Sequence, residues 1–196
     1  MVLASASPRR RDLLAASGFE VFCRPADVEE LSEGLSPRDL VLANAALKAL
    51  DVAPSFNGDL VLGADTIVVL EGEVLGKPRD LSHAAEMLGW LGGRMHEVLT
   101  GVCLLRAGTT NQCCFVESTR VYFRPLDKDL IDRYLNEINP LDKAGSYAAQ
   151  EDHGRLIDRI EGSLDNVIGL PVAQVITAIE THFAELDTLE KLTGRK

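Results

Sequence analysis

A nearly unbroken apolar run of valines and leucines at residues 59–70 constrains the fold of this chain more than any other segment. A strand of this composition is typical of a sheet that is covered on both faces, because neither of its sides can face water. Asp65 interrupts the run, and a carboxylate inside such a strand needs a partner or a function. The segment predicts a central strand, buried on both faces, that carries one acid of special interest.

Helical and strand patterns alternate along the rest of the chain. Capping signals and spaced apolar residues predict helices at residues 7–18, 36–50, 81–91, 127–136 and 171–183. Besides the central strand, the sequence predicts strands at residues 1–4, 20–24, 73–75, 97–106, 112–123 and 156–160. A turn at residues 71–72 joins the central strand to the strand at 73–75, and a turn around Gly108 joins the strands at 97–106 and 112–123. This interleaving predicts an α/β fold with a mixed sheet flanked by helices.

In the predicted helix at residues 36–50, Leu40, Ala43, Leu47 and Leu50 recur at the spacing of one helical face. No linker or repeat divides the chain, so we expect one domain at residues 1–183. The tail at residues 184–196 mixes charges and is expected to be frayed.

Composition and charge exclude several classes of protein. The chain has 196 residues, of which 46% are hydrophobic, and this favours a soluble globular protein. Its 30 acidic and 20 basic residues give a net charge of −10, which disfavours duplex nucleic acid and anionic membranes as partners. The apolar stretches are too short to span a membrane and no secretory signal is visible, so a cytoplasmic location is expected.

The four cysteines, at positions 23, 103, 113 and 114, form no CxxC pair and no Cys/His metal spacing. The sequence therefore predicts neither a disulfide framework nor a zinc site, and we interpret the cysteines as small buried hydrophobes. Cys113 and Cys114 are adjacent on a predicted strand, so their side chains are expected to point to opposite faces of the sheet.

The segment Ser-Ala-Ser-Pro-Arg-Arg at residues 5–10 brings two hydroxyls and two guanidiniums to the predicted start of a helix. The free amides and the dipole at that end favour an anion, and guanidinium groups match phosphate oxygens in shape. The alternative is an ordinary capped helix whose arginines face water. A solvated helix arginine contributes only a few tenths of a kcal/mol, so Arg10→Ala should harm turnover far more than stability.

Three further features could carry chemistry. Asp65 can act as a general base or a metal ligand, and the alternative is an acid that caps the next turn. Lys77 ends a GEVLGK segment that fails the spacing of a phosphate-binding P-loop, so it is either a cation for a ligand or a surface lysine. The polar loop at residues 140–150 can line a pocket or serve as a capped connection.

Five separated motifs resemble those of the Maf family of nucleoside-triphosphate pyrophosphatases. In chain order they are ASASPRR at residues 4–10, GADT at 63–66, GEVLGKPRD at 72–80, PLDKAGSY at 140–147 and NVIGLPV at 166–172. Ala6 stands where the family usually has glycine. The resemblance implies an elongated α/β fold similar to that of inosine-triphosphate pyrophosphatases, with two lobes around a cleft, and a homodimer.

The resemblance also implies an activity, which is hydrolysis of a nucleoside triphosphate to the monophosphate and pyrophosphate. It makes Asp65 the general base and implies a divalent cation, Mg²⁺ with Mn²⁺ or Co²⁺ as alternatives, held by Glu30 and Asp65. The phosphate-handling positions it implies are Ser5, Arg9, Arg10, Lys48 and Lys77.

Substrate choice in the family resembles a three-position code. Arg9, Thr66 and Gln150 match the subgroup that prefers dTTP and UTP, and modified pyrimidine nucleotides are further candidates. The chain departs from many relatives at residues 151–153, Glu-Asp-His, where they continue with glycine. The alternatives are a pyrophosphatase for 7-methyl-GTP or ITP, and a nucleotide-sensing regulator of septum formation. A pure sensor has no need for the general base that Asp65 provides.

Overall fold

The structure is a computed structural model that describes residues 1–183, and the predicted tail at residues 184–196 lies outside them. Two compact units divide the chain. Unit 1 comprises Met1–Asp65, Thr100–Glu117 and the residues from Gly169 on, and unit 2 comprises Thr66–Leu99 and Ser118–Ile168.

The strands form a mixed sheet in the order β2-β1-β3-β5-β6-β7, with β4 beside β3. β1 runs parallel to β2 and β3, whereas the β3–β4 and β6–β7 pairs are antiparallel. Their bounds are β1 (Val2–Leu3), β2 (Phe22–Cys23), β3 (Leu60–Leu70), β4 (Glu73–Leu75), β5 (Met95–Arg106), β6 (Gln112–Phe123) and β7 (Ile157–Glu161). The predicted α/β class with a mixed sheet is confirmed.

The helices begin where the capping signals predicted. Ser7 and Ser36 cap the first two, each followed by proline, and Asp80 and Asp127 cap the next two through their side chains. Their bounds are α1 (Pro8–Ala16), α2 (Pro37–Val52), α3 (Leu81–Leu91), α4 (Lys128–Glu137), α5 (Leu164–Ile168) and α6 (Val172–His182). The sequence analysis missed α5, because its five residues are too few to show a helical period. In the described part of the chain no helix has the length and apolarity needed to cross a membrane.

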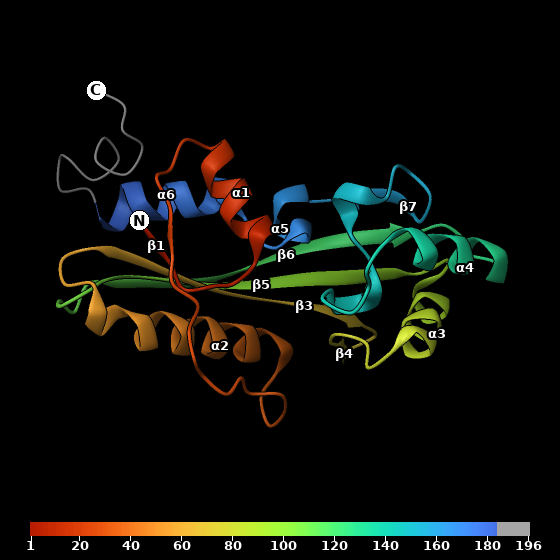
Figure 1. Cartoon of the computed structure of the whole chain (residues 1–196), viewed down its shortest axis with the longest axis horizontal. Coiled ribbons are helices and arrows are strands. Elements are labelled where there is room, and N and C mark those ends of the chain that lie inside the picture. Colours follow the sequence, from red (N-terminus) through yellow and green to blue (C-terminus); the bar gives the residue numbers. More distant parts are fainter. Residues whose placement is uncertain (184–196) are drawn as a thin grey trace. The chain divides into compact units, whose positions relative to one another are not determined.

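Unit 1 buries β3 from both sides. Leu60, Leu62 and Ala64 lie in one apolar cluster with residues of α1 and α6, whereas Val61 belongs to a second cluster with α2. Figure 1 shows α1 and α6 on one side of the strands and α2 on the other. The expected burial of this strand on both faces is confirmed.

Helix α2 approaches the sheet closely because two strand residues lack a side chain. A Cβ added to Gly63 would lie 2.1 Å from the Ala45 carbonyl oxygen, and one added to Gly101 would lie 2.2 Å from that of Val41. The buried face of α2 consists of Leu40, Val41, Asn44, Ala45, Lys48, Ala49 and Val52. Leu40 of the predicted pattern lies on this face, but Leu47 and Leu50 are exposed, so the leucine spacing identified the face only in part.

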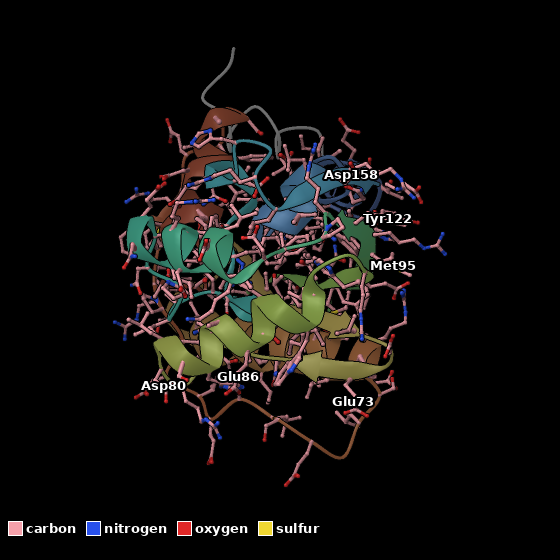
Figure 2. All side chains as sticks on the ribbon, turned by 90° about the vertical axis from the view of Figure 1, so that its right-hand side faces the viewer. Glu73, Asp80, Glu86, Met95, Tyr122 and Asp158 are labelled. Carbon is pink, nitrogen blue, oxygen red and sulfur yellow. The ribbon has the colours of Figure 1, made fainter. Side chains whose placement is uncertain are left out.

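Unit 2 has its own apolar core, in which Val68 and Leu70 of β3 pack with residues of α3 and α4. Figure 2 labels four residues of this unit that mark its elements, namely Asp80 at the start of α3, Glu86 within α3, Tyr122 on β6 and Asp158 on the paired strand β7. The loop at residues 140–151 is tied to this core. The Gly145 amide donates to the Gly76 carbonyl oxygen at 3.1 Å, and the Ala148 amide donates to the Tyr134 hydroxyl at 3.0 Å.

His96 is buried in unit 2, and its Nε2 shares a hydrogen bond of 2.8 Å with the Tyr147 hydroxyl. Burial lowers the pKa of His96 from 6.5 to about 4. Below pH 6.5 the unfolded chain binds a proton at this residue that the folded chain does not, so stability should fall as the pH drops towards 4. We expect a loss of about 3 kcal/mol near pH 4, measured by urea unfolding at several pH values.

His96→Gln keeps a hydrogen-bonding group beside Tyr147 but does not titrate, so its unfolding free energy should depend less on pH over this range. His153→Gln, at an exposed histidine, is the matched control and should keep the full pH dependence. Equal pH dependence in His96→Gln and the unsubstituted protein would show that His96 is not the group responsible.

Candidate active site

Asp65 lies near the centre of β3 with its side chain towards α2, and it is 7% exposed. The Lys48 ammonium donates to Asp65 Oδ1 at 2.8 Å, and the Asn44 amide donates to Asp65 Oδ2 at 3.2 Å. Asn44 and Lys48 are four residues apart and therefore share one face of α2. The acid in the apolar strand thus has partners on both of its oxygens, rather than capping a turn.

Glu30 joins the same lysine from an acidic loop. Its Oε1 lies 2.9 Å from Lys48 Nζ, and its side chain is 53% exposed whereas that of Lys48 is 11% exposed. Asn44 fixes this loop to α2, because its amide donates to the Leu31 carbonyl oxygen at 3.0 Å and its Oδ1 accepts from the Leu31 amide at 2.8 Å. Two carboxylates therefore meet at one buried ammonium group.

Arg10 is held by atoms from both ends of unit 1. Its Nη1 donates to Ser5 Oγ at 3.0 Å, and its Nε donates to the Gly169 carbonyl oxygen at 2.8 Å. Ser5 Oγ also accepts from the Ser7 amide at 3.2 Å, which fixes the turn between β1 and α1. Ala6, in place of the family's glycine, sits in this turn without a left-handed backbone conformation.

Arg10 is not solvated, which corrects the premise taken from the sequence. It is 9% exposed, and burial lowers its pKa, while the charges of Asp65 and Glu30 oppose that shift. An arginine buried with defined partners contributes to stability as well as to ligand binding, so Arg10→Ala should affect both. The helical pattern of α1 could not reveal this, because the carbonyl partner comes from Gly169, at the far end of the chain.

The other sequence-predicted residues are less enclosed. Arg9 is half-buried in unit 1 and close enough to Arg10 for its charge to lower the pKa of that neighbour. In unit 2, Thr66 follows Asp65 along β3 and is half-buried, whereas Lys77 is exposed after β4. Gln150 is exposed and its amide lies 3.5 Å from Glu151 Oε1. Unit 1 therefore brings together Ser5, Arg10, Glu30, Lys48 and Asp65.

The Glu-Asp-His departure at residues 151–153 forms a braced turn in unit 2. Asp152 is buried, and its carboxylate accepts from the amides of Leu156 at 2.8 Å and Ile157 at 3.1 Å. Arg155 donates to the carbonyl oxygens of Glu151 at 2.9 Å and Asp152 at 3.1 Å. These contacts fix the backbone directly after Gln150, so the departure has a structural role of its own.

The donor set can be compared with what a divalent cation requires. Mg²⁺ is commonly bound by one or two carboxylates, completed by phosphate oxygens and waters. Within residues 1–183 no group of three or more His, Cys, Asp or Glu side chains could hold a metal ion. The pair Asp65 and Glu30 therefore fits a cation that is shared with a phosphorylated ligand, and such a cation would compete with Lys48 for the same oxygens.

Asn44 is a member of this cluster that the sequence analysis missed. A signal was present, since an asparagine four residues before Lys48 lies on the same helical face, but the leucine pattern drew attention to Leu47 and Leu50, which are exposed. The arrangement as a whole supplies one buried carboxylate with fixed orientation, a second carboxylate nearby, and an anchored guanidinium. Such a group can accept a proton from water next to an anionic ligand.

Comparison with known proteins adds an independent finding. A family model described as "Maf-like protein" matches residues 1–182. A dTTP/UTP pyrophosphatase of Anaeromyxobacter dehalogenans is 49% identical over 177 residues, which cover 89% of each chain. Proteins of the same name from Geotalea uraniireducens and Pyrococcus abyssi are 43% and 42% identical, over 91% and 93% of this chain and 93% and 96% of their own. The likeness thus spans both units.

Proposed function

The chain belongs to the Maf family, and from that premise we propose that it hydrolyses dTTP and UTP to the monophosphate and pyrophosphate. Relatives that carry this activity in their names align over about nine-tenths of the chain. The observation that carries the proposal is the buried Asp65, whose two oxygens are held by Lys48 and Asn44.

The proposed mechanism gives Asp65 and its neighbours distinct tasks, with Asp65 serving both as general base and as a ligand of the cation. Asp65 accepts a proton from the attacking water, because each of its oxygens keeps a lone pair beyond the hydrogen bond to α2. Lys48 and Asn44 fix the direction of that carboxylate. Arg10, anchored by Ser5 and Gly169, offers its guanidinium charge to phosphate oxygens, and its neighbour Arg9 adds further positive charge. A phosphate-handling role for Lys77, which belongs to unit 2, rests on the family resemblance alone. A divalent cation held by Asp65 and Glu30 would supply charge neutralisation on the phosphates.

Several further properties follow from the family resemblance and stay predictions. They are Mg²⁺ as the cation, with Mn²⁺ or Co²⁺ as alternatives, a homodimer, and the two-lobed fold of inosine-triphosphate pyrophosphatases with its cleft. The cytoplasmic location, which was expected from the sequence pattern, also stays a prediction. The extent of the catalytic domain, residues 1–183, is also a proposal.

We propose that the selection of the nucleobase depends on Gln150. Its amide can donate to O4 and its carbonyl oxygen can accept from N3–H of thymine or uracil, whereas cytosine presents the reverse pattern. Gln150 is exposed in the free protein, so the proposal requires that a bound base covers its side chain. A polar group buried in this way and left unpaired costs about 1–3 kcal/mol, so kcat/KM for UTP should exceed that for CTP roughly ten- to a hundredfold. The measurement is pyrophosphate release from dTTP, UTP, CTP, ITP and 7-methyl-GTP at equal concentrations.

Gln150→Glu removes the amide donor and should lower the UTP to CTP ratio towards one. Gln112→Glu, at an exposed glutamine of β6, is the matched control and should keep the ratio. An unchanged ratio in Gln150→Glu would remove this residue from base recognition. Faster turnover of ITP or 7-methyl-GTP would favour the alternative pyrophosphatases, and nucleotide binding without any pyrophosphate release would favour the sensor.

A further inference from the structure

Two cysteines of unit 1 face each other across neighbouring strands. Cys103 lies on β5 and Cys114 on β6, and their sulfur atoms are 2.6 Å apart. The Arg106 amide donates to the Asn111 carbonyl oxygen at 3.0 Å, next to the turn that joins the two strands. Cys103 lies three residues before Arg106 and Cys114 three residues after Asn111, so the two cysteines are equally far from that turn. The strand pairing therefore holds the two thiols together, without help from a flexible loop.

The two thiols differ in access to solvent. Cys103 is 1% exposed and packs in the apolar cluster beneath α2, whereas Cys114 is exposed. Cys113 packs against the cluster on the opposite face, so the expected alternation of this adjacent pair is confirmed. The expectation that all four cysteines are buried is wrong for Cys23 and Cys114, which are both exposed. Cys23 lies on β2, the strand at the end of the sheet order.

We propose that Cys103 and Cys114 form a redox modification site, which a peroxide converts to an intramolecular disulfide. The sulfur separation is already close to the S–S bond length of about 2.05 Å, so closure needs only a small side-chain movement. Cys113 cannot compete for Cys103, because it points to the other side of the sheet.

The electrostatics of the pair indicate which of the two sulfur atoms reacts with the peroxide first. The hydrogen bond between the two sulfur atoms lowers the pKa of Cys114 and raises the pKa of Cys103, and burial raises the pKa of Cys103 further. The thiolate is the nucleophilic form of cysteine. The exposed residue is thus the attacking one, and the buried residue stays a thiol that can resolve the product.

The chemistry has two balanced steps. The Cys114 thiolate attacks one oxygen of hydrogen peroxide, the O–O bond breaks, hydroxide leaves and takes up a proton as water, and Cys114 becomes a sulfenic acid. The Cys103 sulfur then attacks the Cys114 sulfur, and its proton leaves with the hydroxyl group as a second water. Two thiols are oxidised to one disulfide while one peroxide is reduced to two waters.

The test is peptide mapping of the full chain after treatment with hydrogen peroxide and alkylation of the remaining thiols. Trypsin cleaves after Arg94, Arg106 and Arg120, so the two cysteines fall on separate peptides, residues 95–106 and 107–120. We expect a linked pair of these peptides that is lighter by two hydrogen atoms than their sum. Dithiothreitol should release it.

Three variants assign the link. Cys113→Ser should keep the linked pair, whereas Cys103→Ser and Cys114→Ser should each lose it, and Cys103→Ser should accumulate oxygen adducts on Cys114. A link through Cys113 or Cys23, or oxygen adducts on Cys114 without any link in the unsubstituted protein, would overturn the proposal. Neither cysteine belongs to the proposed catalytic group, so Cys114→Ser should keep its nucleotide turnover before oxidation.

Discussion

Asp65→Asn is expected to lower pyrophosphate release from UTP by a factor of about 10² to 10⁴, while the chain still folds. The amide has the volume of the carboxylate but cannot accept the proton of water, and general base catalysis contributes a factor of this size. Lys48 keeps its ion pair with Glu30 in this variant, so the buried ammonium is not left without a carboxylate. The measurements are kcat for UTP and the free energy of unfolding in urea.

Asp132→Asn is the matched control, because Asp132 is a half-exposed acid of α4 whose ion pair with Lys128 lies on the surface of unit 2. It should change neither turnover nor stability noticeably, as surface ion pairs contribute about 0–1 kcal/mol. If Asp65→Asn turned over UTP at a near-normal rate, Asp65 would have a structural role and the proposed mechanism would be wrong.

Arg10→Ala is expected to lower kcat/KM for UTP about a hundredfold and to cost about 1–3 kcal/mol of stability. The first effect follows from the loss of a guanidinium aimed at phosphate. The second follows from the loss of the hydrogen bonds to Ser5 Oγ and the Gly169 carbonyl oxygen. Steady-state kinetics and urea unfolding of the same preparation separate the two.

Arg11→Ala provides the comparison within the same helix. Arg11 is exposed, and its guanidinium forms an ion pair with the neighbouring Asp12. Arg11→Ala should therefore leave both kcat/KM for UTP and the free energy of unfolding nearly unchanged. Arg10→Lys keeps the charge but not the planar fork, and should recover part of the stability and little of the turnover. Normal kinetics in Arg10→Ala with reduced stability would make Arg10 a structural link between the ends of unit 1.

The sequence predicts local features of this fold well, because they depend on neighbouring residues. Each predicted helix and strand is present, since proline after serine, alternating apolar residues and glycine turns act over a few positions. The short helix α5 carries no such period and was missed. Asp65, by contrast, could be recognised from the sequence, because it is an acid surrounded by apolar residues within one strand.

Contacts between distant segments could not be predicted in this way. The sequence pointed to Lys48 and Glu30 through a resemblance, but nothing local indicated that both meet Asp65, as their positions depend on how α2 and the acidic loop pack. Asn44 escaped notice for a related reason, because the exposed leucines of α2 imitate a buried stripe. The roles of these residues in catalysis stay predictions.

The close approach of α2 to the sheet also limits how this protein can be altered. Gly→Ala substitutions within strands are a common route to higher stability, but one methyl group at Gly63 or Gly101 would meet the helix backbone. To make room, α2 would have to move as a body, and it would carry Asn44 and Lys48 away from Asp65. A library screened for thermostability should therefore recover glycine at both positions even if turnover is never assayed, and a variant that tolerates alanine at Gly63 would need a second change in α2.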